Sequence, residues 1–396
     1  MNEIRTLQPH ELQESIALSQ FAFQYELTAE QQAEQVGKMD PSQLLGYFKD
    51  GTLAAKLQVI PFHTWVNGRR FAMGGIAGVA TWPEYRRGGM VAQLLGQALK
   101  SMRDRGQTLS FLAPFKFEFY RKYGWETYVD YVRYEIPADK LPKFEAAEGS
   151  KIVRVDKNGE LLNSVYEAYA KQFNGMLERD AHWWNERYLK GKKGTVAVYV
   201  NPQGEQRGYV FYQVKDRAAT IHDFVFLDEE ARRGLWKFIA DHDSMMTKVE
   251  LNAPADDQLP FLMHDPRFAQ ERTTYFSARI VDAESFLAQY AFEARGDAEP
   301  LYLRISDRHA EWNEGVYRLD FTDDGANANV TKLPEGEAPA EEALLSCSIQ
   351  TLAALLLGYQ KAGFMSRIGR LGGADEQIVR LGNAIPQRTT YLMDFF

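Results

Sequence analysis

Residues 75–102 combine an apolar run, a basic glycine turn and a helical repeat, and this combination most constrains the fold. The run 75–81 ends before Pro83, and the turn Arg86-Arg87-Gly88-Gly89 follows. Apolar residues then recur at helical spacing: Val91, Leu94, Leu95, Ala98, Leu99 and Met102. A strand that enters a helix through a glycine turn brings free backbone N–H groups to the positive end of the helix dipole. The sequence therefore predicts an α/β unit with an anion-binding turn.

Turn signals and shifts in composition divide the 396-residue chain into three segments. A chain of this length exceeds one typical hydrophobic core, so two or three domains are expected. Proline, lysine, glutamate and glycine gather at residues 141–150, which indicates a linker. We expect domains at 1–146, 147–283 and 284–396, each with mixed α and β structure.

Local patterns predict several individual elements. Residues 53–60 and 63–66 are typical of successive strands, and Asn67-Gly68 marks a hairpin turn after them. An apolar stretch at 348–360 predicts a helix, and alternation over residues 390–396 predicts a strand at the end of the chain.

Residues 223–235 repeat the layout of the opening segment: an apolar strand, an acidic residue, Arg-Arg-Gly and a helix. When the arginine pairs are aligned, Leu235 stands where Gly89 stood, so a side chain would cover the backbone. This pattern predicts a duplicated domain that has lost its anion site. A chance match of so short a pattern is the alternative.

Composition narrows the class of protein. The net charge of −8 at pH 7 argues against a nucleic-acid partner and is compatible with a cationic substrate. With Cys347 as the single cysteine, neither a disulfide nor a cysteine-rich zinc site is expected. His222-Asp223 and residues 241–243 do not put two histidines on one helical face, so we expect no metal. No signal segment and no run of about 20 apolar residues is present, so a cytoplasmic protein without membrane contact is expected.

Residues 79–92 and 119–126 together resemble the GNAT acyltransferase superfamily, and more narrowly the enhanced-intracellular-survival (Eis) family of acetyltransferases. The family's cofactor motif, Val-x-x-x-Pro-x-x-Arg-Arg-x-Gly, is filled by Val79, Pro83, Arg86, Arg87 and Gly89. Its second motif is filled by Tyr120, Lys122, Tyr123, Gly124 and Trp125. Residues 173–184 and 259–267 are family-like as well, so the resemblance spans nearly the whole chain.

The resemblance implies an α+β fold with two tandem GNAT-like domains and a C-terminal domain of sterol-carrier-protein-2 type. Only the first domain would bind acetyl-CoA, in agreement with Leu235 in the second copy. The implied acetyl-CoA contacts are Val79, Ala80, Thr81, Arg87, Gly88, Gly89, Met90, Val91, Ala92, Phe115 and Lys116. A homo-hexamer is implied as well.

The resemblance also implies an N-acetyltransferase that acts on primary amines of a polyamine-like or aminoglycoside-type small molecule. Tyr120 would act as general acid toward the coenzyme A sulfur. The general base would be the terminal carboxylate of Phe396, since an α-carboxyl group with a pKa of about 3.5 is ionised at neutral pH.

Other functions remain open at this point. Protein lysines could be the acceptors, longer acyl chains could be the donors, or a non-enzymatic sensor could use the sterol-carrier-like domain. The family often has an acidic residue directly before the last one, whereas this chain has Phe395 there and Asp394 one step earlier. That departure bears on aminoglycoside recognition more than on acetyl transfer.

Overall fold

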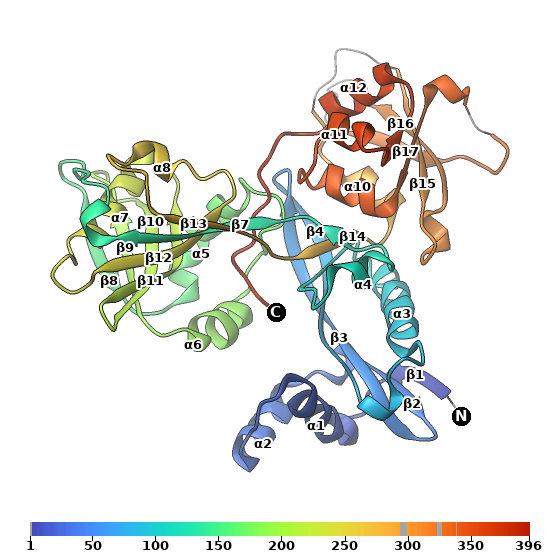
Figure 1. Ribbon diagram of the computed structural model, residues 1–396, viewed down its shortest axis with the longest axis horizontal. Helices are drawn as coiled ribbons and strands as arrows, with labels where there is room; N and C mark the ends of the chain where they lie inside the picture. Colours follow the sequence, from blue (N-terminus) through green and yellow to red (C-terminus); the bar gives the residue numbers. More distant parts are fainter. Residues whose placement is uncertain (1, 294–298, 323–326, 338) are drawn as a thin grey trace.

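The computed structural model describes residues 2–293, 299–322, 327–337 and 339–396, which form three β-sheets with helices packed against them (Figure 1). The first two sheets have seven strands each and the third has five. The mixture of sheets and helices confirms the expected α+β fold. Within the described ranges, none of the helices combines the length and apolar character needed to cross a bilayer.

The first sheet has the strand order β1-β2-β3-β4-β5-β14-β6. Its strands are β1 (Asn2–Thr6), β2 (Leu44–Lys49), β3 (Thr52–Val66), β4 (Arg69–Thr81), β5 (Leu109–Leu112), β6 (Glu126–Thr127) and β14 (Ser277–Ile280). Its helices are α1 (Leu12–Phe23), α2 (Ala29–Lys38), α3 (Met90–Asp104) and α4 (Phe117–Arg121). Asn67 and Gly68, both at positive φ, make the predicted turn between β3 and β4. Residues 53–60 and 63–66, expected as two strands, belong to one strand because β4 pairs with it along almost its full length.

The second sheet has the order β13-β7-β12-β11-β10-β9-β8. Its strands are β7 (Asp130–Pro137), β8 (Lys151–Val155), β9 (Thr195–Val200), β10 (Gln206–Lys215), β11 (Ala218–Phe226), β12 (Lys248–Pro254) and β13 (Ala269–Thr274). Its helices are α5 (Gly159–Ala170), a π-helix (Trp183–Tyr188), α6 (Leu189–Gly191), α7 (Glu229–Ala240) and α8 (Leu259–Leu262), with α9 (Ala283–Gln289) after it. Helix α7 buries Leu235 and Ile239 against one face, whereas α5 covers part of the other.

These two sheets repeat one arrangement and exchange a strand. In each, a strand, a helix and a parallel strand follow one another: β4-α3-β5 in the first and β11-α7-β12 in the second. Strand β7, from the segment expected to form the first domain, lies in the second sheet, and β14 lies in the first. The domain limits at 146 and 283 stay predictions, but the hydrogen bonds of the sheets do cross them.

The third sheet has the order β17-β16-β15-β18-β19. It consists of β15 (Leu301–Ser306), β16 (Gly315–Phe321), β17 (Ala328–Lys332), β18 (Leu344–Ser348) and β19 (Leu371–Gly372), with helices α10 (Ile349–Leu356), α11 (Ala362–Arg367) and α12 (Asp375–Ala384). The helix expected over 348–360 is α10, which ends earlier, before Gly358 at φ +85°. A buried ion pair between Arg279 of β14 and Asp307, at 2.6 Å, fixes this unit to the first sheet.

The last residues leave the third unit and run back between the first two, so that the chain ends near β4 and β14 (Figure 1). The strand expected over 390–396 is wrong: the segment is extended but joins no sheet, and makes only an isolated bridge from Thr390 to Asn174. Asn174 accepts from the backbone N–H of Tyr391 at 3.0 Å, and its side chain accepts from the Asn67 N–H at the hairpin turn at 2.7 Å. One buried asparagine therefore ties the C-terminal tail, defined here as residues 386–396, to the first domain.

Candidate active site

Strand β4 contains a bulge at the point where it separates from β5. Two residue steps on β3, from Lys56 to Gln58, oppose three on β4, from Ala80 to Ala77, so β4 carries one extra residue. Gly78, within this bulge, has φ +57°, and a Cβ added there would meet open space. The parallel pairing with β5 extends only as far as Ile76. The backbone of residues 79–81 is thus turned toward a gap between two diverging strands.

The basic turn before α3 contains two residues with left-handed backbone angles. Arg87 has φ +69° and Gly89, the residue that caps α3, has φ +73°. A left-handed backbone conformation at an arginine costs of order 1 kcal/mol, and it is retained where the surrounding structure or a ligand requires it. The first turn of α3 has no acidic side chain and no side-chain cap. The positive end of the helix dipole is therefore available to an anion.

The corresponding end of α7 is already neutralised. The Asp228 carboxylate accepts from the Ala231 N–H at 2.9 Å, and Glu229 and Glu230 occupy the first turn. Arg232 and Leu235 lie inside the helix rather than in a turn before it. The second domain repeats the fold but offers no open anion site at this helix.

A cavity of about 690 Å³ lies between the β4 bulge and the start of α3. Most of the predicted cofactor residues line it, namely Val79, Ala80, Thr81, Arg87, Gly89, Met90, Val91, Ala92 and Phe115. Gly88 and Lys116 do not, and Lys116 instead pairs with the exposed Glu118 at 3.1 Å. The sequence reasoning missed Phe23 at the end of α1 and Phe119 on α4, which also line the cavity. No motif marks Phe23, because α1 reaches the cavity only through the tertiary fold.

Tyr120 lies on α4, beside this cavity and behind its aromatic wall. Its ring contacts Phe115 and Phe119 with centroids 5.3 and 5.1 Å away, and it is 2% exposed. Burial raises the pKa of the phenol well above its usual range. Tyr120 therefore keeps its proton at neutral pH.

The ring of Phe396 is held over β4 by other aromatic rings. Its centroid lies 4.8 Å from that of Phe62 and 5.0 Å from that of Phe276. A Cβ on Gly75 would come within 2.7 Å of this ring, so the glycine makes room for it. The ring of Phe396 therefore lies against Gly75, three positions before Gly78 in the β4 bulge. Strand β4 also lines the cavity.

A buried ion cluster anchors the tail two residues before its end. The fully buried Asp394 carboxylate accepts from Arg179 Nε at 3.0 Å and from Trp183 Nε1 at 2.8 Å. Arg179 also donates to Asp223 at 2.9 Å, and Tyr209 donates to the same carboxylate. Burial alone would raise the pKa of Asp223, but Arg179, Lys192 and the hydrogen bonds from Arg179 and Tyr188 together outweigh it, and the pKa is lowered. The sequence analysis considered Asp223, which follows His222, as a candidate metal ligand. In the structure Asp223 is one partner in this ion cluster.

A second cavity, of about 510 Å³, lies on the other side of the β4 bulge. Gly78, Phe62 and Trp183 line it, so it adjoins both the bulge and the residues that hold the chain end. Asp40 and Asp180 also line it, and neither has an ion-pair partner among the described side chains. Lys56 in its wall is tied to Ser15 and Ser19 of α1, and burial lowers its pKa to about 8. We refer to this space as the acceptor cavity.

Models of known protein families match a segment in each of the three parts of the chain. Models of the GNAT acetyltransferase domain match residues 3–128 and 175–280, and a model of the sterol carrier protein domain matches residues 283–393. These matches confirm the order of two GNAT domains and a sterol-carrier-protein-2-like domain.

Relatives match across most of the chain. An uncharacterized N-acetyltransferase of Streptomyces avermitilis is 26% identical over 91% of this chain and 89% of its own. The N-acetyltransferase Eis of Mycobacterium tuberculosis is 25% identical over 77% of this chain and 76% of its own. A conserved protein of Enterococcus faecalis V583, described as a "Probable N-Acyltransferase", is 30% identical with a TM-score of 0.91, and the match covers all of both chains. Eis1 of Mycobacterium abscessus shares the fold over both full chains, with a TM-score of 0.81 at 22% identity.

Proposed function

Because the chain belongs to the Eis-like GNAT N-acetyltransferases, we propose that it transfers the acetyl group of acetyl-CoA to a primary amine of a small cationic molecule. Polyamine-like and aminoglycoside-type amines are the proposed acceptors, Tyr120 is the general acid, and the Phe396 carboxylate is the general base. The observation that carries the proposal is the anchored tail. A buried aspartate and two aromatic rings hold the chain end beside the β4 bulge.

The residues around the first cavity fit acetyl-CoA. Open space beside Gly78 and Gly89 lets a ligand approach the backbone closely, and the N–H groups at the start of α3 suit a pyrophosphate. Arg87 has no ion-pair partner among the described side chains, so its guanidinium is available to a phosphate oxygen. Bound there, acetyl-CoA would supply a thioester whose acetyl group is open to attack by an amine.

Tyr120 supports the departure of the thiol. Its phenol stays protonated because burial raises its pKa, so it can donate a hydrogen bond as negative charge develops on sulfur. Tyr120 is itself buried, so little water reaches this donor, which strengthens the interaction.

The Phe396 carboxylate supports the attack of the amine. A carboxylate with a pKa of about 3.5 is far too weak to deprotonate a free ammonium ion of pKa about 10 completely. It is strong enough to take the proton from the amine while the new C–N bond forms, because the nitrogen becomes acidic as it acquires positive charge. Fixing the position of the carboxylate therefore accelerates the reaction more than raising its pKa would.

The acceptor cavity favours a cation. Asp40 and Asp180 have carboxylates without an ion-pair partner among the described side chains, and neither is paired with Arg187 in the same lining. Ammonium groups spaced along a polyamine or an amino sugar match such carboxylates. The net charge of −8 adds long-range attraction for the same class of molecule. The hexamer remains a proposal that rests on the resemblance, and the cytoplasmic location remains a proposal as well.

The test is incubation with acetyl-CoA and a panel of amines: spermidine, an aminoglycoside, lysine and a lysine-containing peptide. Release of free thiol is followed, and the acetylated product is identified by mass spectrometry. We expect turnover with the multiply charged amines. Thiol release at background with every amine, in a protein that binds coenzyme A in calorimetry, would overturn the proposal.

A further inference from the structure

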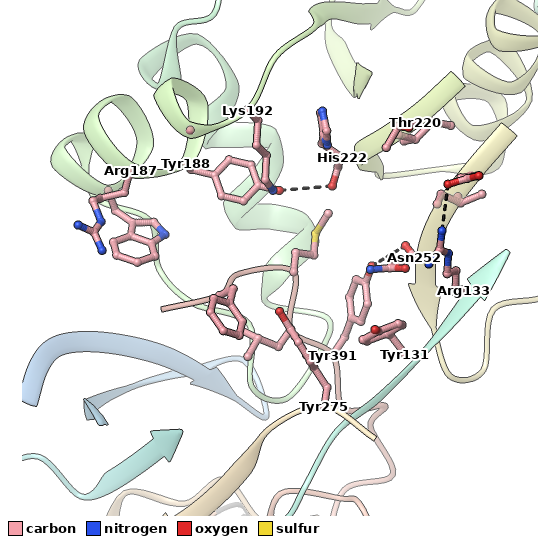
Figure 2. A pocket seen from close by; sticks show the side chains of 18 of the residues that line it. Tyr131, Arg133, Arg187, Tyr188, Lys192, Thr220, His222, Asn252, Tyr275 and Tyr391 are labelled. Atoms are coloured by element: carbon pink, nitrogen blue, oxygen red, sulfur yellow. Dashed lines mark hydrogen bonds and ion pairs between the residues drawn. The ribbon is translucent and has the colours of Figure 1, made fainter. Parts of the chain in front are cut away.

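A third cavity, of about 810 Å³, opens on the second domain. It shares Trp183 and Arg187 with the acceptor cavity but none of the residues that line the first cavity. Its floor is the face of the second sheet opposite α7, where Thr220, His222 and Asn252 point outward from β11 and β12. The π-helix and Lys192 form one wall, and the tail forms another through Tyr391, as Figure 2 shows. The volume is within the usual range of small-molecule sites, about 300–1,000 Å³.

The lining of the cavity contains more cationic than anionic side chains. Its two carboxylates are already paired: Glu250 with Arg133 at 3.0 Å, and Glu186 with Lys190 at 3.3 Å. Two further cations, Arg187 and Lys192, make no ion pair with a carboxylate among the described side chains, although the buried Asp223 and Asp394 attract Lys192 from a greater distance. Burial lowers the pKa of Lys192 to about 8 even though Asp223 and Asp394 favour its charged form, so an anion in the cavity would favour that form further.

Aromatic rings supply the rest of the lining. In Figure 2, Tyr188 lies near Lys192 on one side of the cavity, and Tyr131, Tyr275 and Tyr391 lie on the other. The Lys192 ammonium lies 3.4 Å from the centroid of the Tyr188 ring. Phe395, at the rim, is 68% exposed. A flat ring fits between such walls, and an acidic group on it would meet the two unpaired cations.

We propose that this cavity binds a small anion built on a flat ring, such as an aromatic phosphate or carboxylate, and that the bound ligand holds the C-terminal tail in place. Tyr391, Leu392, Met393 and Phe395 contribute to its lining, directly beside the Asp394 anchor. A ligand that contacts these residues binds only the docked tail, so it stabilises that state by mass action. Binding and tail docking need no acetyl transfer, so the inference does not depend on the proposed function.

Pyridoxal 5′-phosphate is a suitable probe, because it joins a ring, a phosphate and an aldehyde that forms an imine with a neutral lysine. Borohydride reduces the imine, and peptide mapping then identifies the labelled lysine. We expect Lys192 to be labelled before the other lysines. Pyridoxine 5′-phosphate, which has no aldehyde, should protect it. Labelling spread over exposed lysines, without such protection, would overturn the proposal.

Variants test the charge. Lys192→Met should weaken binding of pyridoxine 5′-phosphate in calorimetry by about tenfold or more, the loss of one charge-assisted contact. The matched control, Lys193→Met, removes an exposed neighbour outside the cavity and should bind as the unmodified protein does. If Lys192→Met does not fold, Arg187→Gln serves instead, with the same expected loss. Equal binding by Lys192→Met and Lys193→Met would contradict the site.

The link to the tail has its own readout. Carboxypeptidase A removes a C-terminal phenylalanine only when the tail leaves its docked position. With pyridoxine 5′-phosphate at about ten times its Kd, the undocked fraction and the release of Phe396 should fall about tenfold. Binding that leaves the rate of Phe396 release unchanged would refute the link to the tail.

Discussion

Replacing Asp394 with asparagine tests whether the buried ion cluster is what positions the chain end. The substitution keeps the shape of the side chain and an oxygen that can accept from Trp183 Nε1. It removes one of the two negative charges that face the fully buried Arg179, whose other partner is Asp223. Tyr275, which donates to the Asp394 backbone carbonyl at 3.1 Å, is not disturbed directly.

The expected cost follows from the burial of the pair. Removing one partner of a buried ion pair typically destabilises by about 3–5 kcal/mol, and an isosteric amide should come near the lower value. The tail can undock and expose residue 394 to water, which avoids this destabilisation without any unfolding of the sheets. A loss of about 3 kcal/mol in docking lowers the docking equilibrium constant roughly 100-fold, at about 1.4 kcal/mol for each factor of ten, and the docked population falls by up to the same factor.

The assay compares kcat/KM for acetyl transfer with the Kd for coenzyme A. We expect Asp394→Asn to lower kcat/KM by up to roughly 100-fold while the Kd for coenzyme A stays unchanged, because the cavity between the β4 bulge and α3 does not include the tail. Asp241→Asn is the matched control, since its exposed ion pair with Lys237 contributes only about 0–1 kcal/mol. A kcat/KM for Asp394→Asn within threefold of that of Asp241→Asn would refute the reasoning.

Three further predictions follow from other parts of the structure. One alanine added after Phe396 moves the terminal carboxylate away from β4, so acetyl transfer should be lost in the thiol assay while calorimetry still detects coenzyme A binding. Retained transfer would exclude the terminal carboxylate as base. Gly89→Ala strains a residue at φ +73° and fills the anion cradle, so the Kd for acetyl-CoA should rise about tenfold or more, whereas Gly96→Ala within α3 should leave it unchanged. Equal values for both variants would count against the cradle. Burial lowers the pKa of Lys56 in the folded protein to about 8, whereas the pKa in the unfolded chain is about 10.5. Between pH 8 and about 10.5, Lys56 is therefore protonated in the unfolded chain but neutral in the folded protein, and the free energy of unfolding should rise with pH. Urea denaturation of Lys56→Met should lack this rise, and an identical slope in both proteins would contradict it.

The parts of the fold that local patterns encode could be predicted from the sequence. The turn before α3 and the hairpin at Asn67-Gly68 depend on neighbouring residues, and the structure has both. The buried positions Leu94, Leu95, Ala98, Leu99 and Met102 on α3 follow from helical spacing alone. The duplication was visible for the same reason, since a strand, an arginine pair and a helix recur within one short segment.

Features that depend on distant partners could not be predicted. An acidic residue beside a histidine, as at Asp223, has the same local appearance whether it binds a metal, faces solvent or pairs with Arg179. The tail alternates like a strand, but Asp394 satisfies buried side chains and not a neighbouring strand. The Gly78 bulge follows from the register of β3 against β4, which the β4 sequence alone does not specify. The roles of Tyr120 and Phe396 came from the family resemblance and remain proposals.

The exchange of β7 and β14 has a consequence for how the protein emerges from the ribosome. Strand β5 ends at Leu112, but β14, which lies between β5 and β6 in the finished sheet, ends only at Ile280. At about 5–20 residues per second, roughly 10–30 s of synthesis separates the two. During that interval the nascent chain presents the unpaired edge of β5, a site for association with other chains. Successful production of this protein should therefore depend on chaperone protection of a half-built N-terminal sheet.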